Sequence, residues 1–243
     1  MAETPEIIPL RCGTIRAAAN LLEAGAEGEL VLPVYAYLIT HPAKAPVLFD
    51  TGIDPELDGK LWMGAFANSV PPHETIAARL EALDLGERGL GGVILSHGHY
   101  DHAGGLPLIG DVPVYAHQNE ALEGVDAGRD LRRTGDLFDV FGDGSVEAFA
   151  TPGHTAGHQS LRVRRFGGGH DVLAGDACYF CRSLGRTDVD QTYVADKTLF
   201  VESKKRLAAM RAAGDFVIPG HDEAFLDQIP EASAVRPGPM SRA

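Results

Sequence analysis

Cysteine is scarce in this sequence, and long apolar runs are missing. The 243 residues include three cysteines, Cys12, Cys178 and Cys181, a small odd number that does not fit the disulfide framework of a secreted domain. No stretch approaches the roughly 18 uninterrupted apolar residues of a membrane-spanning helix. The N-terminal residues are acidic where an export signal would be basic and then apolar. We therefore expect a cytoplasmic protein without a membrane partner.

Positive charge is also in short supply. The chain has 21 Lys and Arg residues against 34 Asp and Glu residues, which gives a formal net charge of −13. Nucleic-acid binding relies on Lys and Arg side chains that neutralise phosphates. The composition therefore predicts no nucleic-acid partner and argues against a nuclease.

Two of the cysteines form a Cys178-x-x-Cys181 pair. Such a pair could be a redox centre or half of a zinc site, but the chain has no second pair and the flanking residues do not resemble a thioredoxin helix. We interpret both as small buried thiols.

Short apolar runs rich in β-branched residues predict strands. They are Val31–Ile39, Pro46–Phe49, Val93–Leu95, Val112–Tyr115, Val146–Phe149, Leu161–Val163, Val172–Ala174 and Phe216–Ile218. Apolar residues at helical spacing predict two helices, Glu74–Leu83 with Ile76, Leu80 and Leu83 on one face, and about Thr192 to Ala212 with Leu199, Leu207 and Met210 on one face; Gly214 is the expected helix stop.

These strands and helices alternate without a long linker or a change of composition. The pattern predicts one α/β domain of sheets covered by helices over residues 1–227. Residues 228–243 contain Pro230, Pro237 and Pro239, and we expect a tail that lies on the surface or is frayed.

Four side chains that commonly bind metals lie within six residues, directly after the predicted strand Val93–Leu95. They are His97, His99, Asp101 and His102. In an extended segment the first three share one face and His102 points elsewhere, so that one loop can serve two metals. Zinc and similar divalent ions accept imidazole and carboxylate ligands. The motif therefore predicts metal binding.

Three further candidate ligands follow other predicted strands. They are His154, Asp176 and His221, and a glycine precedes each of them, which removes a side chain next to the metal. With the first motif they make five histidines and two aspartates, a set that suits two metal ions and one bridging carboxylate. We expect zinc, with manganese, iron and cobalt as alternatives.

The His-x-His-x-Asp-His pattern of residues 97–102 and the later ligands resemble the metallo-β-lactamase superfamily over nearly the whole chain. The resemblance implies an αββα sandwich with the site at one edge between the sheets. It implies a first metal held by His97, His99 and His154, a second held by Asp101, His102 and His221, and a bridge made by Asp176.

The resemblance also implies residues that support the ligands. Asp50 in Asp50-Thr51-Gly52 matches a family motif whose aspartate orients a ligand histidine, although such a segment is also typical of turns. His158 follows a family pattern and has an expected supporting role. The other four histidines, for which we expect surface positions, are His41, His73, His117 and His170.

Within the superfamily the chain is most similar to N-acyl-homoserine lactonases, because Tyr179 stands three residues after Asp176. This implies attack of a metal-bridging hydroxide on the lactone carbonyl, with Tyr179 stabilising the oxyanion and Asp101 carrying the proton to the leaving alkoxide. An apolar cluster after Gly52 is the expected wall for the acyl chain, or else core or a homodimer contact. Its members are Leu57, Leu61, Trp62, Met63 and Phe66.

Other functions share parts of this pattern. A broader lactone or aryl-ester hydrolase has the same ligands, and so has a glyoxalase-II-like thioesterase, which usually carries a basic C-terminal region that this chain lacks. A phosphodiesterase is opposed by the charge, and diiron oxygen reductases have glutamate at the position of His99. A metal-stabilised binding module is disfavoured because a two-metal set leaves coordination positions open. The expected partner is a small lactone or ester.

Overall fold

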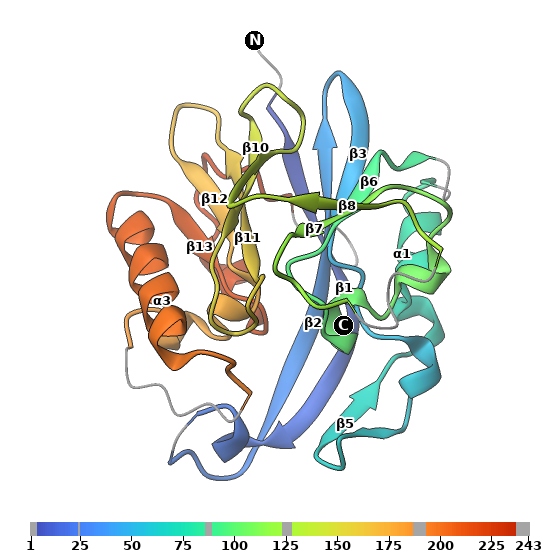
Figure 1. Ribbon diagram of the computed structural model, residues 1–243, viewed down its shortest axis with the longest axis vertical. Helices are drawn as coiled ribbons and strands as arrows, with labels where there is room; N and C mark the ends of the chain where they lie inside the picture. Colours follow the sequence, from blue (N-terminus) through green and yellow to red (C-terminus); the bar gives the residue numbers. More distant parts are fainter. Residues whose placement is uncertain (1–3, 24, 86–88, 123–127, 187–192, 237–243) are drawn as a thin grey trace.

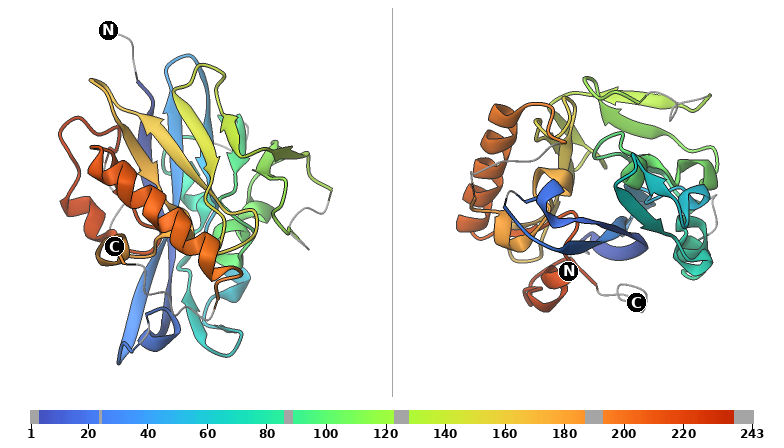
Figure 2. Two further views of the ribbon diagram at one scale, coloured as in Figure 1. Left: turned by 60° about the vertical axis from the view of Figure 1, so that its left-hand side comes forward. Right: turned by 90° about the horizontal axis from the view of Figure 1, so that it is seen from below.

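Two β-sheets lie face to face, and helices cover their outer faces (Figures 1 and 2). The computed structural model describes residues 4–23, 25–85, 89–122, 128–186 and 193–236. This arrangement confirms the predicted single α/β domain with an αββα layering. No helix among these residues is long and apolar enough to cross a membrane.

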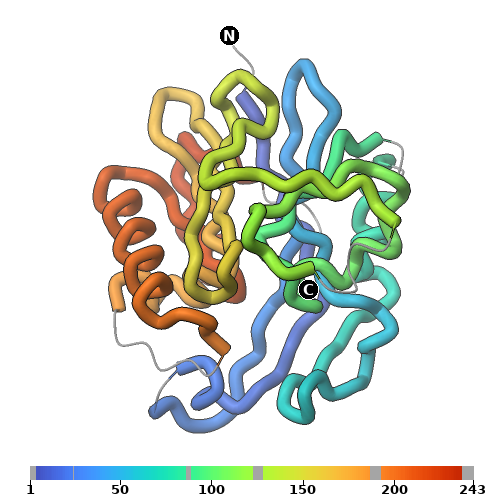
Figure 3. Tube along the Cα trace, in the orientation of Figure 1, coloured from blue at the N-terminus to red at the C-terminus, as the bar shows by residue number. Residues whose placement is uncertain are grey.

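The first sheet has eight strands within the described residues. In spatial order they are β4 (Leu61–Trp62), β5 (Phe66–Ser69), β1 (Glu6–Ala18), β2 (Glu29–His41), β3 (Lys44–Phe49), β6 (Gly92–Ile94), β7 (Val114–His117) and β8 (Leu131–Thr134). The antiparallel hairpin of β1 and β2 runs through the middle of the molecule, as the chain trace shows (Figure 3). From β3 to β8 neighbouring strands are parallel, so their carboxyl ends meet at one edge.

The second sheet has five strands in the described part of the chain. Their order is β13 (Phe216–Ile218), β12 (His170–Leu173), β11 (Gln159–Arg164), β10 (Val146–Ala150) and β9 (Leu137–Asp139). Neighbouring strands are antiparallel except β12 and β13. Because β12 and β13 are parallel, the segments that follow Leu173 and Ile218 lie at the same edge of the sheet. These segments carry Asp176 and His221.

The main core fills the space between the sheets. Side chains of the first sheet such as Tyr37, Phe49 and Ile94 pack there against side chains of the second such as Leu161 and Leu173, and all are at most 4% exposed. Burial of these large apolar side chains, worth about 1.5–3 kcal/mol each, holds the two sheets together. The sheets therefore form one rigid support for the loops at their edge.

Each outer face is covered by one main helix. The helix α1 (Ile76–Glu81) packs Ile76 and Leu80 against the first sheet, and α3 (Lys197–Ala212) packs Leu207 against the second. A third helix, α2 (Tyr100–Ala103), is a single turn within the first motif. Within the described residues the short 3₁₀ helices are η1 (Ala19–Leu21), η2 (Pro55–Leu57), η3 (Pro72–Glu74), η5 (Leu106–Leu108), η6 (Gly175–Ala177), η7 (Cys181–Ser183) and η8 (Glu223–Asp227).

Every predicted strand is present, Phe216–Ile218 with the predicted bounds and the other seven with shifted ends. Five strands within the described residues were not predicted: β1, β4, β5, β8 and β9. The 13-residue β1 is the largest omission. It contains Pro9, Gly13 and two arginines, and its pairing with β2 shifts register between Arg11 and Thr14. It is held by partners on both sides, β2 and β5, which no local pattern reveals.

Both predicted helices begin later than expected, because each starts at a capping side chain. Thr75 caps α1 by accepting a hydrogen bond from the Ala78 amide, and Asp196 caps α3. The predicted buried face of the second helix was wrong at Leu199, which is 38% exposed. The residues that face the sheet are Phe200, Ser203, Lys204 and Leu207. The predicted start at Thr192 lies outside the described residues.

The described part of the predicted tail is anchored. Ala234 donates its amide proton to Asp171, and Val235 forms a bridge with Ile7. Both Ala234 and Val235 are buried, so this stretch is not frayed, and residues 237–243 lie outside the described part.

The structure also places three residues with a predicted burial or exposure, His117, Cys178 and Cys181. The expected surface position of His117 was wrong, because the residue is 3% exposed and its Nε2 atom lies 3.1 Å from Asp136 Oδ1. Cys178 is a free buried thiol as predicted, and Cys181 is free and half-buried.

Candidate metal centre

All seven predicted ligands lie at one edge of the sandwich, each after the carboxyl end of a strand. The segment after β6 carries His97 to His102, and the segments after β10, β12 and β13 carry His154, Asp176 and His221. The glycines before the later ligands have a steric reason: a Cβ on Gly153 would lie 2.1 Å from the Phe200 amide nitrogen. The fold therefore brings together ligands that are up to 124 residues apart in the chain, from His97 to His221.

Four of these residues form the first ligand group: His97, His99, His154 and Asp176. The Nε2 atom of His154 lies 2.9 Å from His99 Nδ1, 3.2 Å from His97 Nε2 and 3.2 Å from Asp176 Oδ2. Three imidazole nitrogens and one carboxylate oxygen thus converge on one point. This is the number and type of ligands that a tetrahedral divalent ion takes.

The second ligand group consists of Asp101, His102 and His221. The Oδ2 atom of Asp101 lies 3.7 Å from His102 Nε2 and 3.6 Å from His221 Nε2. His102 faces this second point because it lies on the turn of α2, whereas His97 and His99 lie on the extended segment before it. His102 thus faces away from His97 and His99 as expected, but the expectation that Asp101 shares their face was wrong, because Asp101 also lies on the turn of α2 and belongs to the second group.

Asp176 lies between the two groups. Its Oδ2 faces the first group, and its Oδ1 lies 3.2 Å from His102 Nε2 and 3.0 Å from His221 Nε2. Within the described residues, neither Asp176 Oδ1 nor His102 Nε2 has a hydrogen-bond partner, although both are buried. Buried polar atoms of this kind need a partner, and the donor set fits divalent metal ions.

Most of the imidazoles are held through their other ring nitrogen. His102 Nδ1 lies 2.8 Å from Asp50 Oδ2, as predicted for Asp50, and His221 Nδ1 donates to the Pro33 carbonyl at 3.0 Å. The Nδ1 atom of His97 lies 3.0 Å from Ser96 Oγ. Such contacts fix the orientation and the tautomer of a ligand histidine.

The supporting position expected for His158 is also present. Its Nε2 accepts the amide proton of Asp176 at 3.0 Å, and its Nδ1 lies 2.9 Å from the Thr151 hydroxyl. Burial lowers the pKa of His158 to about 3, which keeps the ring neutral and able to accept this bond. His158 therefore fixes the backbone at Asp176.

The two groups differ in their electrostatics. Burial, together with His102 and His99, holds the pKa of His97 well below its usual value. Burial also lowers the pKa of His102, but Asp176, Asp101 and Asp50 outweigh it and the net shift is upward. The pKa of Asp176 is lowered, because His102 and His221 outweigh the effect of burial. The centre is thus built around an ionised Asp176.

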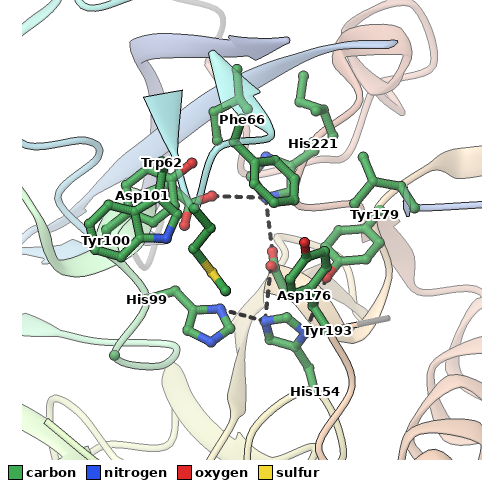
Figure 4. Close-up of a pocket in the computed structure, with 15 residues that line it drawn as sticks. Trp62, Phe66, His99, Tyr100, Asp101, His154, Asp176, Tyr179, Tyr193 and His221 are labelled. Atoms are coloured by element: carbon green, nitrogen blue, oxygen red, sulfur yellow. Dashed lines mark hydrogen bonds and ion pairs between the residues drawn. The ribbon is translucent and has the colours of Figure 1, made fainter. Parts of the chain in front are cut away.

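A cavity of about 380 Å³ opens directly onto both groups (Figure 4). Trp62 and Tyr100 stack on one side of it with ring centroids 4.6 Å apart, and Tyr179 and Tyr193 lie on the other side. Of the predicted apolar wall, Trp62, Met63 and Phe66 line the cavity. Leu57 and Leu61 are not among its lining residues; Leu57 packs against the core and Leu61 is 62% exposed.

Tyr179 reaches the centre with its hydroxyl group. The phenol oxygen lies 3.1 Å from His154 Nδ1, and the residue lines the cavity although it is only 4% exposed. Burial, with Asp176 and Asp101, raises the pKa of Tyr179 well above 10.0. The hydroxyl is therefore protonated at neutral pH and can donate a hydrogen bond.

The ligand geometry and the layering agree with a family profile. The profile of the metallo-beta-lactamase superfamily matches residues 30–221. The chain belongs to this superfamily. The match spans every candidate ligand of the metallo-beta-lactamase motif, from His97 to His221.

Several relatives within the metallo-beta-lactamase superfamily are similar over most of their length. N-acyl homoserine lactonase AttM of Azorhizobium caulinodans is 26% identical over 245 residues, covering 88% of this chain and 91% of the relative. N-acyl homoserine lactonase AiiA of Bacillus thuringiensis subsp. kurstaki is 28% identical over 235 residues, covering 87% and 90%. A solved N-acyl homoserine lactone hydrolase with N-hexanoyl-L-homoserine at its catalytic metal centre has a TM-score of 0.80 at 23% identity, covering 95% of this chain and 97% of that one.

Sequence reasoning missed several residues of this metallo-beta-lactamase site. Tyr100 and Tyr193 line the cavity, and so do three apolar residues of the N-terminal region, Ile15, Leu22 and Leu32. Tyr100 could have been found from its place inside the motif. The N-terminal residues carry no such signal, because they reach the cavity only through the unpredicted β1 and its neighbours.

Proposed function

We propose that this protein is a two-metal hydrolase that opens the lactone ring of N-acyl-homoserine lactones. The observation that carries the proposal is the position of a largely apolar cavity directly on the two ligand groups. The lactonases AttM and AiiA, similar over most of the chain, support the same substrate class.

The proposed metal ligands are those of the two groups, with Asp176 shared between them. Zinc is the proposed ion, because imidazole nitrogens outnumber carboxylates in the donor set. When bound, two divalent ions would supply a nucleophilic hydroxide at neutral pH and polarise the substrate carbonyl.

Tyr179 is the proposed donor to the lactone carbonyl oxygen. If the proton on His154 Nδ1 is donated to the phenol oxygen, the phenol proton is free to point into the cavity. That proton would stabilise the negative charge that develops on the carbonyl oxygen as the ring carbon is attacked.

Asp101 is the proposed carrier of the proton. It lines the cavity, and its Oδ2 faces the second ligand group. Its Oδ1 would accept the proton released by the attacking nucleophile and donate it to the ring oxygen as the carbon–oxygen bond breaks. The product is then the open-chain hydroxy acid.

The acyl chain is proposed to lie along Trp62, Met63 and Phe66. Apolar contact there would hold the amide-linked chain and exclude water from the reacting carbonyl. We propose a cytoplasmic enzyme acting on small molecules. A homodimer stays a prediction, to be checked by light scattering on the purified protein.

A substrate panel tests the proposal. We expect zinc-loaded protein to release acid from N-hexanoyl- and N-decanoyl-homoserine lactone faster than from a glutathione thioester or a model phosphodiester, read with a pH indicator. Faster turnover of the thioester would replace the assignment with a thioesterase. If a γ-alkyl lactone and an aryl ester are turned over as fast as the acyl-homoserine lactones, the protein is the broader lactone and ester hydrolase instead.

A further inference from the structure

Glu120 is a buried carboxylate just behind the first ligand group. It follows β7 and is 5% exposed. Its Oε1 accepts the amide proton of Gly98 at 2.8 Å. Its Oε2 accepts the hydroxyl proton of Thr155 at 2.6 Å and the amide proton of Gly157 at 3.1 Å.

These three donors belong to the two loops that carry the histidines of the first group. Gly98 lies between His97 and His99, and Thr155 directly follows His154. The two loops are joined to each other through the two oxygens of one side chain. By contrast, the second ligand group is held by other contacts, such as those of His102 with Asp50 and of His221 with Pro33.

Both loops also pack tightly against the backbone around Glu120. A Cβ on Gly98 would lie 2.4 Å from the Ala121 carbonyl oxygen, and a Cβ on Gly157 would lie 2.2 Å from the Glu120 amide nitrogen. Contacts this short leave no room for any residue but glycine. The close approach is what lets one carboxylate reach donors on both loops.

The carboxylate has no ion-pair partner among the described lysines and arginines. Arg133 contacts the backbone carbonyl of Glu120 and anchors the segment, not the charge. Burial of a carboxylate costs several kcal/mol unless hydrogen bonds or cations compensate it, and here three donors do so. The buried carboxylate is therefore stabilised by the two loops that it joins.

We infer that Glu120 is a positioning residue that sets the spacing between His154 and the pair His97 and His99. The inference rests on the proposed metal centre. Its consequence is selective: loss of the carboxylate should weaken metal binding by the first ligand group and leave the second unchanged.

The substitution Glu120→Gln is the sharpest perturbation. A carboxamide keeps the size of the side chain but has one oxygen and one NH₂ group. If the oxygen faces Thr155 and Gly157, the NH₂ group faces the Gly98 amide, and two donors oppose each other. We expect about 10–100-fold weaker metal affinity at the first group, the usual effect of losing a group that orients ligands.

The test uses Co²⁺ as the probe and needs no substrate. Two backgrounds separate the groups: His221→Ala leaves the first group to be measured, and His154→Ala leaves the second. Metal-free protein is titrated with Co²⁺ against a chelator, and the visible absorption of the bound ion is recorded. Glu120→Gln should lower the affinity and change the spectrum in the His221→Ala background only.

Two further variants complete the design. Asp171→Asn alters another buried carboxylate, which binds Ser233 and Ala234 near the start of β12; it should lower Tm without changing Co²⁺ affinity. Thr155→Val deletes a single donor to Glu120 and should weaken the first group in the same direction by a smaller factor. It also serves if Glu120→Gln fails to fold.

The outcomes separate the two proposals. Wild-type protein that binds fewer than two Co²⁺ ions would overturn the proposed metal centre itself. Wild-type protein that binds two, with unchanged affinity in Glu120→Gln or Thr155→Val, would overturn the role of Glu120 alone. Equal weakening at both groups, matched by Asp171→Asn, would reduce Glu120 to a residue that supports only general stability.

Discussion

Removal of the Tyr179 hydroxyl tests the chemistry of the site with the loss of one oxygen atom. In Tyr179→Phe the ring stays in its buried position, and the contact at 3.1 Å with His154 Nδ1 is lost. Two effects are therefore expected and must be separated. The hydroxyl is a proposed donor to the substrate, and it also orients a proposed ligand.

The expected size of the catalytic effect follows from the charge that the hydroxyl would stabilise. Loss of one donor to a developing oxyanion costs about 10²–10³-fold in kcat. Here the charge would be divided between Tyr179 and the metal centre, so we expect roughly 10–100-fold. Because the interaction strengthens in the transition state, kcat should fall and KM should change little.

The assay compares kcat of the wild type and of Tyr179→Phe on N-hexanoyl-homoserine lactone at saturating metal. Saturation removes any contribution from weaker metal binding at His154. Tyr37→Phe is the matched control. Tyr37 is also 4% exposed, its hydroxyl has no hydrogen-bond partner among the described residues, and it is not among the residues that line the cavity. Wild-type kcat in Tyr179→Phe, at full metal content, would refute the oxyanion role and make Tyr179 a packing residue.

The remaining predictions concern the metals, the cavity and the thiols. Asp176→Ala removes the carboxylate that faces both ligand groups, so metal analysis should show loss at both; two retained ions per chain would contradict this. Trp62→Ala removes part of the apolar wall, and KM should rise on the order of tenfold more for an N-decanoyl than for an N-butanoyl lactone; an equal change would exclude Trp62 from chain binding. Burial raises the pKa of Cys12 from 9.0 to about 12, so the folded thiol should resist iodoacetamide at pH 8. Because this pKa is higher in the folded state, the contribution of Cys12 to the free energy of unfolding is present below pH 9 and is lost as pH rises toward 12. A Cys12→Ala variant that loses as much stability as the wild type between pH 9 and pH 12 would contradict the assignment.

The candidate ligands could be predicted from the sequence because their signal is local. Four of them lie within six residues after one strand, and each of the other three follows a glycine at a strand end. Strand ends lie at one edge of such a sandwich. It was therefore predictable that His97 and His221 lie near each other at that edge. Their roles as ligands remain the proposal that the metal titrations test.

Strand β1 shows where local patterns fail. Pro9 and Gly13 interrupt its apolar alternation, and both residues weaken a strand considered alone. The segment is a strand because β2 and β5 pair with it on its two sides. That pairing energy comes from contacts far apart in the chain, and with it come the N-terminal residues that line the cavity.

Which side chains can bind metals follows from the residue types alone, since that depends on the chemistry of imidazole and carboxylate groups. What surrounds those side chains depends on how distant segments pack. Glutamate is usually a surface residue. Glu120 is nevertheless buried and joins two loops, because close packing at Gly98 and Gly157 brings their donors to it. Likewise His117 is buried by its place on β7. Burial and hydrogen bonding depend on contacts between distant segments, and no local pattern encodes them.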